Sequence, residues 1–319
     1  MSPTADRPTV RAAVSFDANT DASNLKSAMK GIGTNEKEII QILGRRTSHQ
    51  RQQILRTYES LYGKELISVL KKELSGDLEK VVLNLMTPIT TYLAQQLKAA
   101  MKGLGTDEKT LIEILCSNDN KSLKEIKIAY NKLYEKALED DLKKETSGDL
   151  KKLLVMLVSA NRQEAACDLS LAPGLAQALY KAGEKKRFGT DEAEFSRIIS
   201  SYSFPLLRCV FDEYEKITGK SFEHAIESEL SGDYKEAILS IYLCSINKHT
   251  FFAKALYDSM KGFGTHDEAL MRIVISRCEI DMGNIKDEYS KAYGKRLEEA
   301  ITSDTDGDYK KILLALVQG

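Results

Sequence analysis

Apolar residues recur three and four positions apart along the chain, which is the spacing of the buried face of an α-helix. One such run follows each of four Gly-Thr dipeptides: Ile39, Ile40, Ile42 and Leu43; Leu111, Ile112, Ile114 and Leu115; Phe195, Ile198 and Ile199; Leu270, Met271, Ile273 and Val274. The threonine is expected to cap the helix that it precedes. With only five prolines and no tryptophan, this pattern predicts an all-α protein.

The four Gly-Thr dipeptides mark an internal repeat. Their threonines are 72, 84 and 75 residues apart, and they are Thr34, Thr106, Thr190 and Thr265. Each repeat divides into five short helices, the last strongly apolar, as at 81–85 and 153–157. We therefore predict a tail at 1–14, repeats at 15–86, 87–159, 173–246 and 247–319, and a connector at 160–172. The tail has Pro3 and Pro8 and no helical stripe, so we expect it to be mobile.

Each repeat also pairs a glycine turn with a distant carboxylate. Forty residues after the last glycine of the turn, an acidic residue opens a second glycine turn, and these residues are Glu73, Glu145, Glu229 and Asp304. Two helical hairpins joined by a crossing helix would place both turns at the same end of the repeat. A Gly-x-Gly-Thr run can also be a plain helix end followed by a helix start, but its fourfold recurrence at a constant offset argues against that reading.

Such a pair of turns suits a hard cation. Glycine reaches backbone conformations closed to other residues, so three carbonyl oxygens can point at one centre. With a bidentate carboxylate this makes about five oxygens, short of the six to eight that Ca²⁺ takes, and a lipid phosphate is a good further ligand. We predict lipid contact by residues beside or at the tips of the turns, namely Lys30, Ile32, Lys102, Leu104, Phe188, Lys261 and Phe263.

Charge and cysteine content restrict the classes of partner. Lys and Arg total 46 against 47 Asp and Glu, so bulk charge offers nothing to a nucleic acid. Five cysteines at irregular spacing, without a CxxC pair, indicate a reducing compartment. No stretch approaches the ~20 apolar residues of a membrane-spanning helix. We expect a cytoplasmic protein that is peripheral on membranes when Ca²⁺ rises. Self-association there is left open, and a protein partner for the tail is disfavoured but not excluded.

The repeated Lys-Gly-x-Gly-Thr turn, the acidic residue forty positions later and the Ser-Gly-Asp or Asp-Gly-Asp turn resemble the annexin family over residues 15–319. The resemblance implies a slightly curved disc of four homologous five-helix repeats that binds acidic phospholipid through Ca²⁺ and serves membrane organisation or trafficking. It implies that the metal ligands are the carbonyl oxygens of Met29, Gly31 and Gly33 with Glu73, of Met101, Gly103 and Gly105 with Glu145, and of Met260, Gly262 and Gly264 with Asp304. Repeat 3 departs from the pattern because its turn is one residue longer than is typical, and its set is Gly183, Lys186 or Arg187, and Gly189 with Glu229.

Other function classes have less support in the sequence. The four histidines share no repeat position and no nucleophile motif is present, so we expect no catalytic residues and no enzyme. A calcium-regulated protein scaffold, or an ion-conducting membrane-associated assembly, remains the alternative. Calcium dependence separates the main prediction from a pure scaffold, which has no use for carboxylates beside glycine turns.

Overall fold

The computed structural model describes residues 5–31, 33–103, 105–164, 168–184, 189–262 and 264–319. Over these residues the chain forms nineteen α-helices and one 3₁₀-helix, and no β-strand beyond an isolated bridge between Gln163 and Tyr202. The prediction of an all-α protein is confirmed.

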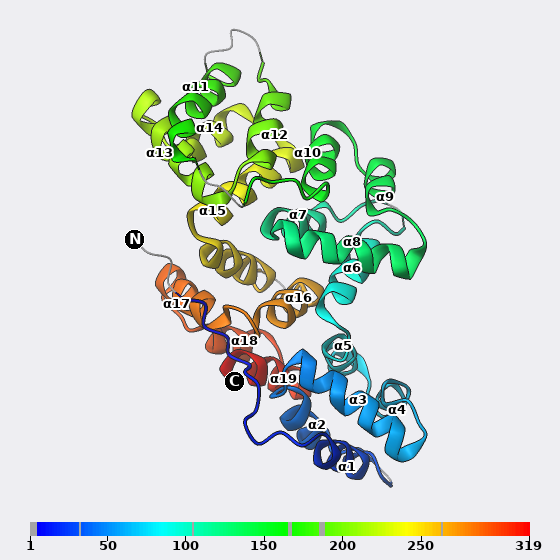
Figure 1. Cartoon of the computed structure of the whole chain (residues 1–319). Coiled ribbons are helices and arrows are strands. Elements are labelled where there is room, and N and C mark those ends of the chain that lie inside the picture. Colours follow the sequence, from blue (N-terminus) through cyan, green and yellow to red (C-terminus); the bar gives the residue numbers. More distant parts are fainter. Residues whose placement is uncertain (1–4, 32, 104, 165–167, 185–188, 263) are drawn as a thin grey trace. The chain divides into compact units, whose positions relative to one another are not determined.

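The helices fall into two compact units, residues 1–92 with 252–319 and residues 93–251 (Figure 1). Unit 1 holds repeats 1 and 4, and unit 2 holds repeats 2 and 3. Two helices, α6 and α15, contribute residues to both units. The helices of unit 1 are α1 (Ala18–Ala28), α2 (Glu36–Leu43), α3 (Ser48–Tyr62), α4 (Leu66–Glu73), α5 (Gly76–Leu85), α16 (Asp267–Arg277), α17 (Met282–Tyr293), α18 (Leu297–Asp304) and α19 (Gly307–Gln318). Those of unit 2 and the shared pair are α6 (Ile89–Ala100), α7 (Glu108–Ser117), α8 (Asn120–Tyr134), α9 (Leu138–Glu145), α10 (Gly148–Val158), η1 (Leu169–Leu171), α11 (Ala172–Ala182), α12 (Glu192–Ser201), α13 (Phe204–Thr218), α14 (Phe222–Glu229) and α15 (Gly232–Ser259).

The five-helix order recurs in every repeat, as the sequence predicted. One boundary is less sharp than the others, because α15 joins the fifth helix of repeat 3 to the first helix of repeat 4. The two parts meet at Asn247, whose φ of −158° and ψ of 102° are not helical. Residues 160–164 and 168–171 of the predicted connector form no α-helix, and α11 begins at its last residue, Ala172.

The predicted apolar runs form the core of each unit. In α2, Ile39 and Leu43 are fully buried, and so are Leu111 and Leu115 in α7. The fifth helices, which are the most apolar in sequence, bury residues such as Val81, Leu153, Ile238 and Leu313. Hydrophobic burial therefore positions the helix ends from which the glycine turns project.

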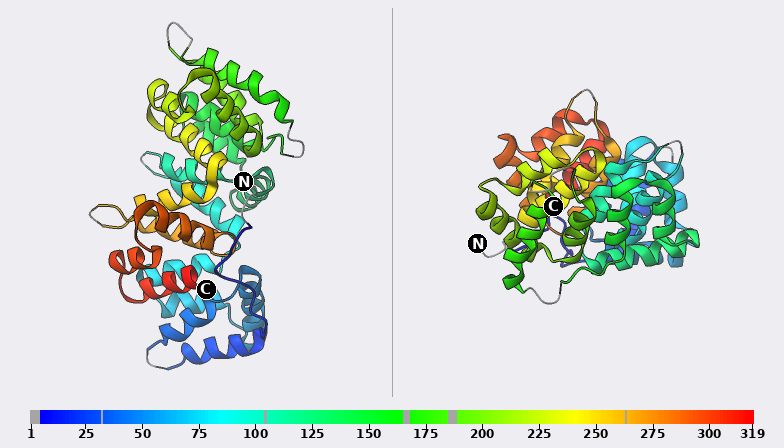
Figure 2. Two further views of the ribbon diagram at one scale, coloured as in Figure 1. Left: turned by 90° about the vertical axis from the view of Figure 1, so that its left-hand side faces the viewer. Right: turned by 90° about the horizontal axis from the view of Figure 1, so that it is seen from above.

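The N-terminal segment differs from the prediction of a mobile tail. Residues 5–14 run along unit 1 past the C-terminus of the chain (Figures 1 and 2). The backbone N–H groups of Thr9 and Val10 donate to the carbonyl of Cys278, and the Thr9 hydroxyl donates to the carbonyl of Leu316 at 2.6 Å. Val10 is buried, at 2% exposure. The prediction was wrong for these residues because a single apolar residue and backbone hydrogen bonds dock an extended segment without any helical stripe.

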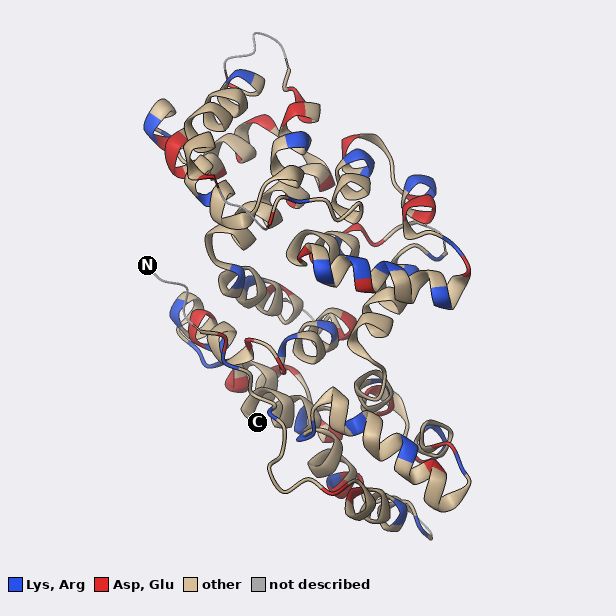
Figure 3. Cartoon of the chain, in the orientation of Figure 1, with Lys and Arg blue, Asp and Glu red and all other residues tan. Residues whose placement is uncertain are grey.

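The charged side chains are mixed in sign along both units (Figure 3). Several ion pairs join exposed residues one helical turn apart, as between Lys152 and Asp149 at 2.9 Å, and such pairs contribute little to stability. Among the described residues, no helix combines the length and the apolar character needed to cross a bilayer.

Candidate calcium sites

A threonine hydroxyl joins the two turns in every repeat. The hydroxyls of Thr34, Thr106, Thr190 and Thr265 donate to the main-chain carbonyls of Glu73, Glu145, Glu229 and Asp304 over 3.3, 2.8, 3.2 and 3.0 Å. In repeats 1, 3 and 4 the same hydroxyl also contacts the carboxylate, at 3.0, 3.2 and 2.5 Å. The proximity that the forty-residue offset predicted is thus present four times.

The threonine is not the helix cap that the sequence suggested. The cap lies one residue later, where the side chains of Asn35, Asp107 and Asp191 accept from the backbone N–H three residues on, at 3.1 to 3.2 Å. His266 holds the same place in repeat 4 and its side chain makes no capping bond. Releasing the threonine from capping leaves its hydroxyl for the carboxylate.

The glycines of the first turns in repeats 1, 2 and 4 share one backbone conformation. Gly31, Gly103 and Gly262 have φ of 102°, 110° and 109°, and Gly33, Gly105 and Gly264 have φ of 88°, 92° and 83°. Side-chain-bearing residues rarely adopt these values, and a Cβ added at any of the six would meet no atom within 4 Å. Glycine is therefore required here by backbone geometry alone and not by crowding, and the three turns can present the same carbonyl array.

The turn of repeat 3 is different in length. A backbone hydrogen bond closes each first turn, from Asn35 to Ala28, Asp107 to Ala100, His266 to Ser259 and Asp191 to Ala182, at 2.8 to 2.9 Å. The first three bonds span seven residues and the last spans nine. The turn is therefore two residues longer than the others, and the predicted single extra residue was wrong. The count also places Gly183 where the other repeats have Met29, Met101 and Met260.

The predicted lipid-contact residues divide into two groups. Lys30, Lys102 and Lys261 are exposed beside their turns, and the Lys261 ammonium also lies 5.6 Å from the centre of the Tyr257 ring. The predicted residues Ile32, Leu104, Lys186, Arg187, Phe188 and Phe263 lie outside the described residues.

Acidic side chains gather between the carboxylates of repeats 2 and 3. A cavity of about 440 Å³ in unit 2 is lined by Glu145 and Glu229, and by Glu108 and Glu192 from the starts of α7 and α12. Asp149 and Asp233 line it as well, and Lys144 is the one cation among the described residues of the lining. So many carboxylates in one cavity give a negative potential that favours divalent cations over anions.

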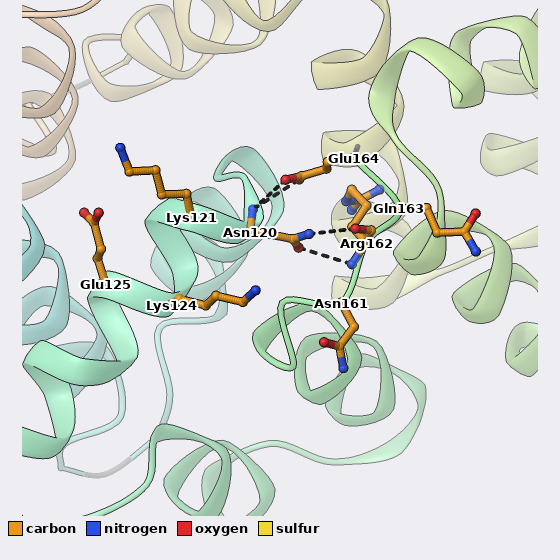
Figure 4. Close-up of a pocket in the computed structure, with 8 residues that line it drawn as sticks. All are labelled: Asn120, Lys121, Lys124, Glu125, Asn161, Arg162, Gln163 and Glu164. Atoms are coloured by element: carbon orange, nitrogen blue, oxygen red, sulfur yellow. Dashed lines mark hydrogen bonds between the residues drawn. The ribbon is translucent and has the colours of Figure 1, made fainter. Parts of the chain in front are cut away.

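A second, larger cavity of about 770 Å³ lies elsewhere in unit 2 and contains none of the predicted ligands (Figure 4). Its polar groups hold the connector against α8. The Glu164 carboxylate accepts from the backbone N–H of Asn120, and the buried Arg162 guanidinium donates to the carbonyls of Ile199 and Tyr202 at 2.8 and 2.6 Å. Sequence analysis missed Arg162, since nothing in its local sequence distinguishes a buried arginine from an exposed one.

Comparison with known proteins agrees with this geometry. The annexin family model matches residues 20–85, 92–157, 175–241 and 251–316. Human annexin A13 is 48% identical over 303 residues, covering 95% of this chain and 96% of that protein.

Solved structures of annexins are also similar to this chain. The structure of annexin III superposes with a TM-score of 0.96 at 44% identity, covering 99% of this chain and 98% of the other. A calcium-bound annexin (Sm)1 structure has a TM-score of 0.89 at 37% identity, covering 98% and 93% of the two chains. With four matched repeats, and with the turn and carboxylate brought together in each, this chain belongs to the annexin family, which is known for calcium-dependent phospholipid binding.

Proposed function

We propose that this protein binds acidic phospholipid surfaces through Ca²⁺ held in the first turns of repeats 1, 2 and 4. The observation that carries the proposal is the threonine contact, which joins the acidic residue to a glycine turn in each of these repeats, through its main-chain carbonyl in all three and also through its carboxylate in repeats 1 and 4. The residues fit the ion, because carbonyl and carboxylate oxygens are the ligands that Ca²⁺ prefers. The ligands would be the carbonyl oxygens of Met29, Gly31 and Gly33 with Glu73, and their counterparts in repeats 2 and 4.

Lipid completes this arrangement for an electrostatic reason. One carboxylate against a dication leaves a formal charge of +1 at each site, and about five protein oxygens leave the coordination shell open. A lipid phosphate supplies both an oxygen and a negative charge. Calcium and lipid then strengthen each other's binding by the same factor, and several sites on one surface multiply the effect. The protein would stay in the cytoplasm at low Ca²⁺ and move to membranes as Ca²⁺ rises.

Repeat 3 is not proposed as an equivalent site. Its carboxylate, Glu229, is in place, but the residue two positions before Gly189 is Arg187, where the other repeats have glycine at a φ above 100°. An arginine does not adopt that conformation without strain. Gly183, Lys186 or Arg187, Gly189 and Glu229 are therefore a weaker set of ligands.

Vesicle sedimentation tests the proposal. We expect the protein to sediment with vesicles of phosphatidylserine and phosphatidylcholine in Ca²⁺ and to stay in the supernatant in chelator. Replacing Glu73, Glu145 and Asp304 together by their amides should reduce sedimentation in Ca²⁺ to the chelator level, with unchanged helix content by circular dichroism.

A matched control removes the same charge from exposed positions on the third helices. Glu59, Glu125 and Glu215 lie on α3, α8 and α13, and replacing all three by glutamine should leave sedimentation unchanged. Binding that survives in the first triple variant would overturn the ligand assignment. Binding that persists in chelator would overturn the calcium mechanism itself.

A further inference from the structure

A buried tyrosine accompanies each of the four carboxylates. Tyr58, Tyr130, Tyr214 and Tyr289 lie fifteen residues before Glu73, Glu145, Glu229 and Asp304. They sit on α3, α8, α13 and α17, the third helix of each repeat, and their exposed fractions are 0%, 0%, 0% and 3%. This offset is as constant as the forty-residue offset that defines the proposed calcium sites.

Two of these hydroxyls are buried without a hydrogen bond. The hydroxyl oxygens of Tyr58 and Tyr214 have no partner in the structure. Phenylalanine would fill the same space without burying an unpaired polar group, which is costly. A tyrosine at such a position therefore points to a partner that is present only in another state of the protein.

The negative charge of the acidic residue acts on both hydroxyls. Burial raises the pKa of Tyr58, and the nearby negative charge of Glu73 adds to the effect. Burial likewise raises the pKa of Tyr214, with contributions from Glu184 and then Glu229. Each buried tyrosine hydroxyl thus lies within electrostatic reach of the acidic residue that the threonine contacts.

Repeat 2 provides an internal contrast. There the Tyr130 hydroxyl donates to Asp141, which also pairs with Lys98 over 2.7 Å. Asp141 stands four residues before Glu145, and the equivalent positions in repeats 1 and 3 are Val69 and Ala225, which offer no acceptor side chain. The hydroxyl of repeat 2 is therefore already engaged.

We propose that Tyr58 is a positioning residue for the calcium site of repeat 1, donating a hydrogen bond to the Glu73 carboxylate when that carboxylate binds the ion. Without the ion, a Glu73 carboxylate oxygen accepts from Thr34. When both oxygens turn to Ca²⁺, Tyr58 becomes the donor that holds them. Such partners of a metal ligand fix its orientation, and their loss typically weakens metal binding 10–100-fold. The inference rests on the proposed function.

The test uses full-length proteins that keep one site each. The repeat 1 parent carries Glu145→Gln, Glu229→Gln and Asp304→Asn, and the repeat 2 parent carries Glu73→Gln, Glu229→Gln and Asp304→Asn. Adding Tyr58→Phe to the first should weaken Ca²⁺ binding at least about tenfold, measured by calorimetry without lipid, and should leave the melting temperature in chelator unchanged or higher. Adding Tyr130→Phe to the second should lower that melting temperature and leave Ca²⁺ affinity unchanged.

A spectrum gives an independent readout. The chain has no tryptophan, so a near-ultraviolet difference spectrum on adding Ca²⁺ reports tyrosine hydrogen bonding. The repeat 1 parent should show this signal, and Tyr58→Phe should remove it. Unchanged affinity in Tyr58→Phe, or a fall in affinity matched by a fall in the chelator melting temperature, would overturn the inference alone. A repeat 1 parent that binds no Ca²⁺ would overturn the proposed site, and with it the inference.

Discussion

The first turns of repeats 1 and 3 leave their helices at equivalent residues and contact equivalent acidic residues, but they differ in length. Both are closed by the same backbone hydrogen bond, from Asn35 to Ala28 and from Asp191 to Ala182. Both send a threonine hydroxyl to the acidic residue, at 3.0 and 3.2 Å. The turn of repeat 3 nevertheless carries two more residues.

The difference shows that each candidate site has two halves with separate origins. The carboxylate half is positioned by packed helices, and all four repeats retain it. The carbonyl half depends on turn length and on glycine at a φ near 100°, and the sequence of repeat 3 differs in both, with two more residues and Arg187 in place of the first glycine. Because the core does not depend on the length of an exposed turn, a repeat can change this turn without losing its fold.

The strongest test of this comparison removes one carboxylate at a time. Glu73→Gln should cost one bound Ca²⁺ per chain and weaken that site by more than about 100-fold, since loss of a residue that only hydrogen-bonds to a metal ligand already costs about 10–100-fold. Glu229→Gln should change the stoichiometry little. Equilibrium dialysis with Ca²⁺ measures both, with Glu59→Gln as a control. Equal losses in the two variants would show that repeat 3 binds Ca²⁺ despite its turn.

Rebuilding the turn of repeat 3 tests the carbonyl half of the candidate site. Deleting Lys185 and Lys186 and replacing Arg187 by glycine restores the length and glycine spacing of repeat 1. We expect about one additional Ca²⁺ per chain, because the carboxylate is already in place. The same deletion with Arg187 kept should gain much less. No gain in either variant would mean that turn length is not what separates the repeats.

Single glycine replacements probe the backbone conformation. Gly103 has a φ of 110° and Gly189 a φ of 69°, and neither has a neighbour within 4 Å of an added Cβ. Alanine at 103 should make the exposed turn relax, which weakens the repeat 2 site about tenfold, or about 1.4 kcal/mol. Alanine at 189 should leave Ca²⁺ binding unchanged and cost about 1 kcal/mol of stability. Calorimetry measures the change in Ca²⁺ affinity and urea unfolding measures the change in stability. Weaker Ca²⁺ binding in Gly189→Ala would contradict the proposal that repeat 3 is not an equivalent site.

Alkaline pH should destabilise repeats 1 and 3 in the same direction, because it ionises tyrosines that are buried among the packed helices. Burial raises the pKa of Tyr58 and of Tyr214. A folded pKa above the unfolded value of about 10 gives stability that is fully present below pH 10 and is lost as pH rises through the folded pKa. The free energy of unfolding should therefore fall above pH 10. Tyr58→Phe and Tyr214→Phe should each reduce that fall in urea titrations, and a fall that neither variant alters would argue against buried, neutral phenols.

The helix caps should be the least sensitive to turn length. Asn35 and Asp191 accept from the N–H groups of Glu38 and Glu194 at the same distance of 3.2 Å. Asn35→Ala and Asp191→Ala should thus each destabilise the fold by about 1 kcal/mol. His266→Asp should stabilise it by a similar amount, since the histidine side chain makes no capping bond. Thermal unfolding measures all three, and a much larger loss in only one alanine variant would mean that the turn does influence its cap.

Much of the fold and half of each candidate site were available from the sequence alone. The apolar spacing that placed Ile39 and Leu43 in a helix is a local signal, and fourfold repetition removed the ambiguity that one copy would have had. The offset from Gly33 to Glu73 could be read in the same way, since a constant distance between two turns implies a constant contact. Even the odd turn of repeat 3 was visible, although its length was misjudged because the residues that close it cannot be identified without their hydrogen bond.

Only the tertiary structure showed which polar groups have hydrogen-bond partners. Thr9 and Val10 hydrogen-bond to the carbonyl of Cys278, and the buried Arg162 guanidinium donates to backbone carbonyls. The hydroxyl of Tyr130 has a hydrogen-bond partner, whereas that of Tyr58 has none. Tyr58 and Tyr130 occupy the same position of the repeat, so no local pattern distinguishes them. Their difference arises from Asp141, eleven residues from Tyr130 and on another helix. Periodicity along a chain records which residues are buried, whereas hydrogen bonding is decided by the atoms that packing brings within about 3 Å of each other.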